Sequence, residues 1–152
     1  MLLKDYITLN KNLNRKIFFS GIAFNSSKVK KNNIFFAFKG NKYDGNNYIA
    51  EAIKKGAKVI VSENKIVRNK KENVLFLRSP NVRKLLSKVS YKIFSQKPKT
   101  LVGVTGTNGK SSIADFYYQI LDLNSKKVAS IGTIGIKHKN KKTTLNNTTL
   151  DP

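Results

Sequence analysis

Cysteine is absent from the 152 residues, which excludes disulfides and thiolate chemistry. One histidine and eight carboxylates leave little material for a metal cage built from protein side chains alone. Long apolar runs are missing too, because stretches such as Ile34–Phe38 fall far short of the roughly 20 residues that span a bilayer. The start of the chain, Met1–Asp5, does not show the pattern of a signal peptide. We therefore expect a cytoplasmic protein without membrane insertion.

Arginine is scarce although the chain is strongly basic. The net charge is +22, and lysine supplies 26 of the 30 basic residues while arginine supplies four. AT-rich codons favour Lys, Asn, Ile and Phe together, so genome composition explains the surplus without a partner. A nucleic-acid-binding protein more often concentrates its basic residues on one surface and uses arginine for bidentate contacts with bases. We expect no specific nucleic-acid partner, although a basic nucleic-acid-binding module stays open as an alternative.

Strand and helix patterns alternate along the first part of the chain, which indicates an α/β fold. Apolar residues at helical spacing predict a helix around Tyr48–Ile53, with Gly56 as its stop. A second apolar stripe over Val82–Ile93 predicts another helix, capped by Asn81. The strands that the pattern predicts here are Ile34–Phe38, Lys58–Val61 and Val74–Leu77.

A polar segment with a proline, Ser95–Lys99, predicts a linker. We therefore expect one domain over residues 1–97 and the beginning of another over residues 98–152. In the second, strand Thr100–Val104, a glycine-rich turn, a helix and strand Lys127–Ile131 would begin a parallel α/β sheet, which we expect to be truncated at Pro152. The apolar face expected for its helix comprises Ile113, Phe116, Tyr117, Ile120 and Leu121.

A basic run, Lys137–Lys142, follows that second strand. We expect it to be a solvated loop, with His138 an ordinary surface residue.

The strongest chemical motif is the glycine-rich turn between that strand and helix, Gly103–Ser112. Glycines let backbone N–H groups turn inward around phosphate oxygens, and the start of the next helix directs its positive end at them. Lys110 can offer a charge to the outer phosphates as the catalytic cation, and Ser111 can place its hydroxyl on Mg²⁺. Val104 stands where the strict phosphate-loop pattern has glycine. The residues expected to bind ATP are Gly106, Thr107, Asn108, Gly109, Lys110, Ser111 and Ser112.

This variant of the motif, Gly106–Ser111, resembles the phosphate loop of the Mur ligases and the folylpolyglutamate synthases. Asn25–Ser27, Asn33–Gly40 and Asp44–Gly45 resemble the first domain shared by the two Mur ligases that add the third residue and the terminal dipeptide. Two further segments, Gly132–Gly135 and Asn147–Thr149, resemble the third-residue ligase specifically.

The resemblance implies a small Mur-type α/β domain followed by the truncated start of a central phosphate-loop domain. It also implies that the first domain binds the uridine-diphosphate end of the substrate, and that a later polar segment contacts the muramoyl-peptide part. Packing alone is the alternative for Phe24 and Tyr43, and a plain loop is the alternative for Asn147–Thr149. Asn25 and Ser27 depart from the family's usual aspartate and arginine. The substrate-binding residues implied are Phe24, Ser26, Asn41, Lys42, Tyr43, Asn147, Thr148 and Thr149.

The implied reaction is ATP-dependent amide-bond formation with Mg²⁺. It would add the third amino acid, diaminopimelate or lysine, to UDP-N-acetylmuramoyl-L-alanyl-D-glutamate in peptidoglycan synthesis. The ligase for the D-Ala-D-Ala dipeptide is the alternative enzyme. We expect this chain to be a monomeric N-terminal fragment that is inactive alone.

Overall fold

The computed structural model describes residues 1–8, 16–40, 43–64, 73–139 and 141–144. Its internal contacts divide the chain into two compact units, Met1–Gln96 and Lys97–Asp151. Met1–Gln96 is the N-terminal unit and Lys97–Asp151 is the C-terminal unit.

The N-terminal unit is built on a four-stranded, fully parallel sheet in the order β1-β2-β3-β4. The register pairs Ile34 of β2 with Ile22 on one side and with Val59 on the other. Since all four strands run the same way, their carboxyl ends meet at one edge of the sheet. The strands are β1 Gly21–Ala23, β2 Asn33–Ala37, β3 Val59–Ser62 and β4 Leu75–Arg78.

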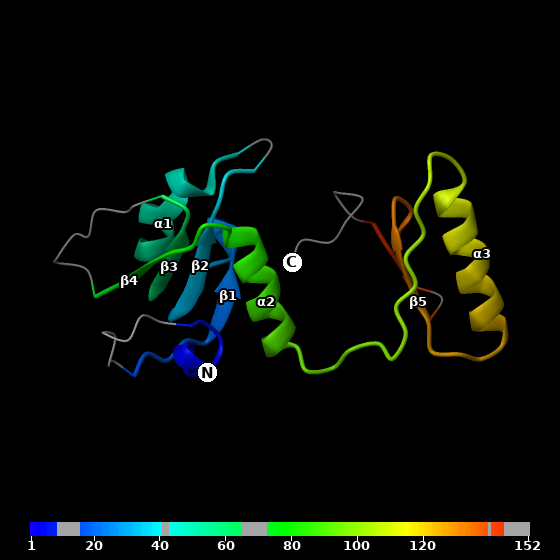
Figure 1. Cartoon of the computed structure of the whole chain (residues 1–152), viewed down its shortest axis with the longest axis horizontal. Coiled ribbons are helices and arrows are strands. Elements are labelled where there is room, and N and C mark those ends of the chain that lie inside the picture. The colour runs from blue at the N-terminus through cyan, green and yellow to red at the C-terminus, as the bar shows by residue number, and fades with distance from the viewer. Residues whose placement is uncertain (9–15, 41–42, 65–72, 140, 145–152) are drawn as a thin grey trace. The chain divides into compact units, whose positions relative to one another are not determined.

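The two central strands are buried on both faces, as continuous apolar runs in a parallel sheet require. Alternate side chains go to opposite cores: Ile34 and Phe36 pack with α2 (Val82–Ile93), whereas Phe35 packs with α1 (Ile49–Lys54). Figure 1 shows the sheet between these two helices. The predicted α/β fold is confirmed for this unit.

The helix boundaries follow from local side-chain and backbone chemistry. Asn81 caps α2, because its Oδ1 accepts a hydrogen bond of 2.8 Å from the Lys84 amide. Gly56 ends α1 with φ +95°, a left-handed conformation that glycine adopts without strain. Three short 3₁₀ turns complete the unit: η1 Leu3–Asp5, η2 Ser26–Lys28 and η3 Gly45–Tyr48.

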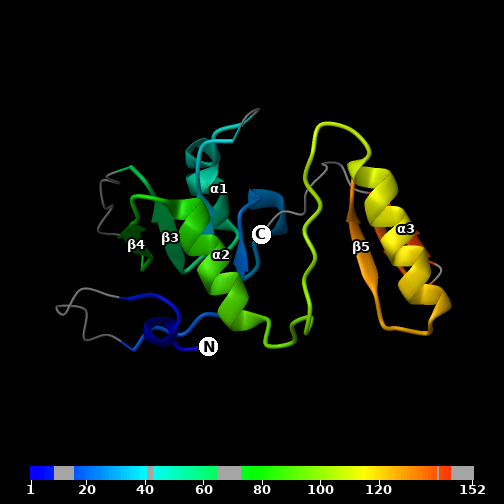
Figure 2. The same cartoon turned by 45° about the vertical axis from the view of Figure 1, so that its right-hand side comes forward.

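The C-terminal unit places one helix, α3 (Lys110–Leu123), beside a three-stranded sheet, as both Figure 1 and Figure 2 show. Its strands are β5 Ala129–Gly132, β6 Gly135–His138 and β7 Lys141–Thr143. Both pairings are antiparallel, β5 with β6 and β6 with β7. The expected parallel start of this sheet is therefore wrong for the described residues.

Two local expectations for the C-terminal unit are also wrong. Thr100–Val104 forms no strand, because no strand in the described part of the chain supplies a backbone ladder for it, and Leu101 is 88% exposed. Lys137–Lys142 was expected to be a solvated loop, but it contributes to β6 and β7. A tight turn after β5 folds the chain back and gives Lys137, Lys141 and Lys142 partners in the sheet. His138 is exposed, as expected.

The apolar face expected for α3 is largely exposed. Phe116 and Ile120 are 62% and 58% exposed, whereas Tyr118, outside the expected face, is buried. The sheet packs against a different face of α3. Asp115 lies on that face, where its carboxylate bonds to Lys137 of β6.

Among the described residues, no helix is long and apolar enough to cross a membrane.

Candidate functional site

The carboxyl edge of the parallel sheet gathers several of the residues expected to bind uridine diphosphate. Phe24 and Ser26 directly follow β1, and Tyr43 follows β2. Open parallel sheets bind ligands beyond the carboxyl ends of their strands. The placement of these residues is therefore compatible with a ligand site.

Ser26 is the most constrained of these residues. It is 8% exposed, and its Oγ donates a 2.9 Å hydrogen bond to Oε2 of Glu51 in α1. Glu51 also pairs with Lys55 at 2.7 Å, and the Lys55 amine donates to the Ser26 carbonyl at 3.2 Å. The Lys55 and Ser26 hydrogen bonds lower the pKa of the Glu51 carboxyl. The hydroxyl of Ser26 thus already has a partner, and only its lone pairs are left for a ligand.

Phe24 and Tyr43 have different surroundings. Phe24 is half-buried and packs against the core on the α2 side of the sheet, in keeping with a packing role. Tyr43 is 72% exposed, so its ring is accessible to a ligand. Asn41 and Lys42, predicted beside it, lie outside the described residues.

Asn25 builds local structure at the same edge. Its Oδ1 accepts hydrogen bonds from the Ser27 amide at 2.9 Å and from the Ser27 hydroxyl at 2.8 Å. These two departures from the family pattern therefore satisfy each other and cap η2.

The phosphate-loop motif occupies the turn before α3. Gly106 and Gly109 have φ of +149° and +75°, and Gly109 is the left-handed N-cap of the helix. Lys110 is the first helical residue, and its amine donates to the carbonyls of Gly106 and Thr107, the latter at 3.0 Å. The lysine charge therefore lies over the loop, next to the positive end of the helix. This combination favours an anion such as phosphate.

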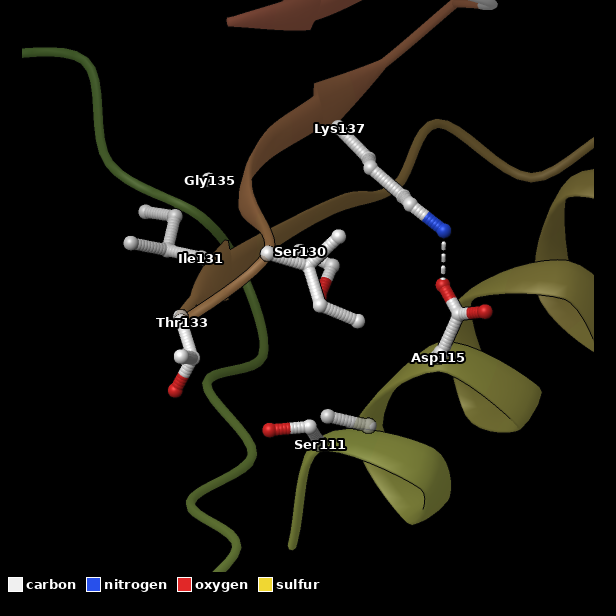
Figure 3. Close-up of a pocket in the computed structure, with 10 residues that line it drawn as sticks. Ser111, Asp115, Ser130, Ile131, Thr133, Gly135 and Lys137 are labelled. Atoms are coloured by element: carbon white, nitrogen blue, oxygen red, sulfur yellow. Dashed lines mark hydrogen bonds and ion pairs between the residues drawn. The ribbon is translucent and has the colours of Figure 1, made fainter. Parts of the chain in front are cut away.

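The two residues after Lys110, Ser111 and Ser112, are exposed. Figure 3 shows Ser111 at the edge of a shallow pocket between α3 and the β5–β6 hairpin. The pocket connects the loop motif with Gly132–Gly135, the segment that carried the more specific resemblance. Its lining residues are Ser111, Ala114, Asp115, Ser130, Ile131, Gly132, Thr133, Ile134, Gly135 and Lys137.

Sequence reasoning missed an ion pair between two residues that line this pocket. Lys137 of β6 bonds to Asp115 of α3, and Gln119 donates to the same carboxylate at 2.9 Å. The hydrogen bond from Lys137, followed by that from Gln119, lowers the pKa of Asp115. One signal was available, since Asp115 lies four residues after Ser111 and thus on the same helical face.

The described residues hold no group of three or more His, Cys, Asp or Glu side chains that could bind a metal ion. The exposed hydroxyl of Ser111 is the loop oxygen that the phosphate-loop pattern assigns to Mg²⁺. Asn147, Thr148 and Thr149 lie outside the described residues.

Two sequence models of one family match in order along the chain. "Mur ligase family, catalytic domain" matches residues 19–91, and "Mur ligase middle domain" matches residues 104–151. The first match covers the parallel sheet and its helices, and the second covers the phosphate loop and the β5–β7 sheet.

Curated relatives include two enzymes named UDP-N-acetylmuramoyl-L-alanyl-D-glutamate–2,6-diaminopimelate ligase. The one from Rickettsia conorii is 43% identical over 119 residues, which cover 77% of this chain and 24% of the relative. The one from Buchnera aphidicola subsp. Schizaphis graminum is 36% identical over 138 residues, which cover 86% and 28%. The chain thus spans about a quarter of the length of these relatives.

Solved structures agree with these matches. A structure of a ligase with the same name aligns over 95% of this chain and 31% of its own, with a TM-score of 0.76 and 21% identity, which supports the fold. The MurF ligase from Thermotoga maritima in complex with ADP aligns over 67% of this chain and 23% of its own, with a TM-score of 0.52 and 29% identity. The matched domains, the parallel sheet and the phosphate loop lead to one conclusion: the chain belongs to the Mur ligase family.

Proposed function

We propose that this chain contains the substrate-nucleotide and ATP-phosphate portions of a ligase that adds diaminopimelate to UDP-N-acetylmuramoyl-L-alanyl-D-glutamate. The single observation that carries the proposal is the loop at α3, where left-handed Gly109 is followed directly by Lys110. The names of the curated relatives supply the substrates. The identity to them, 36–43%, is what favours diaminopimelate over lysine as the added amino acid.

The proposed division of labour follows the two domains expected from the sequence. Residues 1–97 would bind the UDP end of the substrate, with Phe24, Ser26 and Tyr43 at the carboxyl edge of the sheet. Residues 98–152 would bind ATP through the loop that begins at Gly106. We retain Asn41, Lys42, Asn147, Thr148 and Thr149 as proposed substrate contacts.

ATP is needed because a carboxylate is a poor electrophile until one of its oxygens becomes a good leaving group. The substrate carboxylate would attack the γ-phosphate, which releases ADP and forms an acyl phosphate. The amine of the amino acid would then attack the acyl carbon, release inorganic phosphate and lose a proton as the amide bond forms. Lys110 would offset the charge that builds on the transferring phosphoryl group. The structure of the Thermotoga relative contains ADP, which supports an adenine nucleotide as a ligand of this chain.

Mg²⁺ is part of the proposal. The exposed Ser111 hydroxyl fits it as one ligand, because a hydroxyl at this helix position can complete a coordination sphere made largely by phosphate oxygens and water. When bound, the ion neutralises phosphate charge.

The setting of this reaction is also proposed. ATP and UDP-linked sugars are cytoplasmic metabolites, which supports a cytoplasmic protein. We propose a monomer without a specific nucleic-acid partner. The described lysines are spread over both units, and only Arg78 and Arg83 are described arginines.

The ligase that adds the terminal dipeptide is the second candidate, because the Thermotoga MurF ligase is 29% identical to this chain. The curated relatives named as diaminopimelate ligases are 36–43% identical, which favours the first candidate.

Binding calorimetry on the 152-residue chain tests the proposal with two probes. We expect UDP and Mg·ADP each to bind once and independently, because their proposed sites lie in different units. Addition of a tenfold molar excess of mixed-sequence DNA should not displace either nucleotide. If neither nucleotide binds at millimolar concentration, the proposed function is wrong.

A further inference from the structure

Arg83 of α2 contacts Phe38 and Lys39, the two residues that follow β2. Its guanidinium carbon lies 4.4 Å from the centroid of the Phe38 ring, and its Nη2 donates to the Lys39 carbonyl at 3.2 Å. Arginine suits this pair of contacts, because its guanidinium places several donors around one flat, charged group, whereas lysine has a single charged nitrogen.

The helix that carries Arg83 begins at a fixed position. Val82 is fully buried, and its amide donates to Oε1 of Glu63, which follows β3, at 3.3 Å. Asn81 caps the same turn through the Lys84 amide. The backbone of Arg83 is therefore held in place at the start of α2, and its side chain extends from there to Phe38 and Lys39.

The segment that Arg83 contacts is the β2–η3 connection, which is defined here by its described residues Phe38–Gly40 and Tyr43–Gly45. The connection closes on itself, because the Gly40 amide donates to the Tyr43 carbonyl at 2.8 Å and the Gly45 amide donates to the Phe38 carbonyl at 3.0 Å. A Cβ on Gly40 or Gly45 would lie 3.0 Å from backbone atoms of Tyr43 or Phe38, respectively. Close backbone packing thus leaves it few alternative conformations.

A second contact holds the far end of the connection. Asp44 caps η3 by accepting a 2.9 Å hydrogen bond from the Asn46 amide, and Ser62 of β3 donates to Oδ1 of Asn46 at 2.7 Å. The connection is therefore anchored to β3 on one side and, through Arg83, to α2 on the other. Exposed Tyr43 lies between these anchors.

We propose that Arg83 is a positioning residue for the uridine-diphosphate site at this edge of the sheet. It holds the start of the β2–η3 connection against α2, so that Tyr43 is presented in one orientation before the ligand binds. This inference rests on the proposed function of the carboxyl edge. Its energetic role is preorganisation, which improves affinity by lowering the ordering cost of binding.

The test uses the ¹⁵N-labelled 152-residue chain and its Arg83→Met and Arg83→Lys variants. We expect the amides of Gly40 and Gly45 to exchange with solvent at least about tenfold faster in both variants, because the connection loses one anchor. We expect UDP to bind about fivefold more weakly in both, measured by calorimetry. Exchange of the buried β3 amides should stay unchanged, which would show that the unit remains folded.

Lys84→Met is the matched control, because it removes one positive charge from the same helical turn without touching the connection. We expect it to leave the Gly40 exchange rate unchanged and UDP affinity within about twofold, since an exposed charge contributes little. If Arg83→Lys behaves like the unsubstituted chain, charge alone suffices and the positioning role is overturned.

The remaining outcomes separate the two proposals. Unchanged amide exchange at Gly40 and Gly45 in Arg83→Met would overturn the role of Arg83, even if UDP binds. Faster exchange with unchanged UDP affinity would also overturn it, because the contact would then be only structural. An unsubstituted chain that fails to bind UDP, while Arg83→Met still loosens the connection, would overturn the proposed function instead.

Discussion

At the scale of single residues, the phosphate binding that we propose for the Gly106–Ser112 loop depends on a backbone conformation and one charge. Gly109 takes a left-handed conformation immediately before α3, and Lys110 then begins the helix with its amine over the loop carbonyls. The helix start and the lysine thus present positive charge at the same place. Removing the lysine charge isolates its contribution from that of the helix.

Lys110→Ala should weaken Mg·ADP binding to the 152-residue chain at least about tenfold, because a charged partner of the phosphates is lost. Lys126→Ala, which removes a lysine charge at the other end of α3, is the control and should leave the affinity within about twofold. Calorimetric titration measures both. Equal affinities in Lys110→Ala and the unsubstituted chain would show that the loop does not bind phosphate through this lysine.

At the scale of elements, the β5–β7 sheet depends on one glycine. Gly135 has φ +101°, and a Cβ built on it would lie 2.3 Å from the Thr143 backbone oxygen. At that distance the backbones of β6 and β7 must separate, because the atom in the way belongs to the main chain.

Gly135→Ala should therefore open the β6–β7 pairing and destabilise the sheet by about 1–3 kcal/mol. Gly132→Ala is a close control, since its Cβ would meet no atom within 4 Å and should cost less. Amide exchange of Ile136, whose strand pairs with β7, reports the change. Equal protection of Ile136 in the two variants would contradict the close-approach argument.

The pair between Asp115 and Lys137 links α3 to β6 and makes this contact sensitive to acid. The hydrogen bonds from Lys137 and Gln119 lower the pKa of Asp115 below its ordinary value of 3.8. A carboxyl with a lowered pKa in the folded state stabilises that state above the unfolded-state pKa. The stabilisation is lost as the pH falls from 3.8 through the lowered value.

Lys137→Met should raise the pKa of Asp115 toward its ordinary value, since the principal hydrogen bond is removed. A ¹³C carboxyl titration by NMR follows Asp115 directly. Lys139→Met, which removes a neighbouring lysine charge, should shift the titration less. A midpoint that is the same in Lys137→Met and the unsubstituted chain would show that the ion pair does not form in solution.

At the scale of the whole molecule, the N-terminal unit contains its own cores. The described buried residues on both faces of the parallel sheet lie between Leu3 and Val89. Each face is covered by elements from the same unit, so the unit has what a domain needs to fold alone.

Residues 1–96 produced alone should unfold in urea in one cooperative transition, followed by circular dichroism. The midpoint should match that of the corresponding transition in the 152-residue chain to within about 0.5 M, since the sheet and both helices are retained. A fragment without a cooperative transition would mean that the C-terminal unit is required for folding.

Local features were predictable because their causes are local. The cap at Asn81 and the stop at Gly56 depend on a few neighbouring residues, and both are confirmed. The apolar run of β2 likewise specified a buried strand. The positive φ of Gly109 is of the same kind, since a glycine directly before the helical Lys110 adopts it without strain.

Pairings between distant segments were not predictable in the same way. Thr100–Val104 has a strand-like sequence but no ladder partner in the described structure, and a strand forms only with one. Lys137–Lys142 has the composition of a loop, yet the turn that ends at Gly135 brings it into a sheet. The bond between Ser26 and Glu51 joins residues 25 positions apart, as no local pattern could indicate.

The amino-acid sequence by itself thus determined the α/β character, the phosphate-loop motif and the family resemblance, because each depends on short runs of residues. Only the tertiary structure decided which predicted residues share an edge of the sheet. It brought Phe24, Ser26 and Tyr43 to one edge, because parallel strands align their carboxyl ends. It also set Arg83 against Phe38 and Lys137 against Asp115, since side chains on different elements meet only after the sheets have formed.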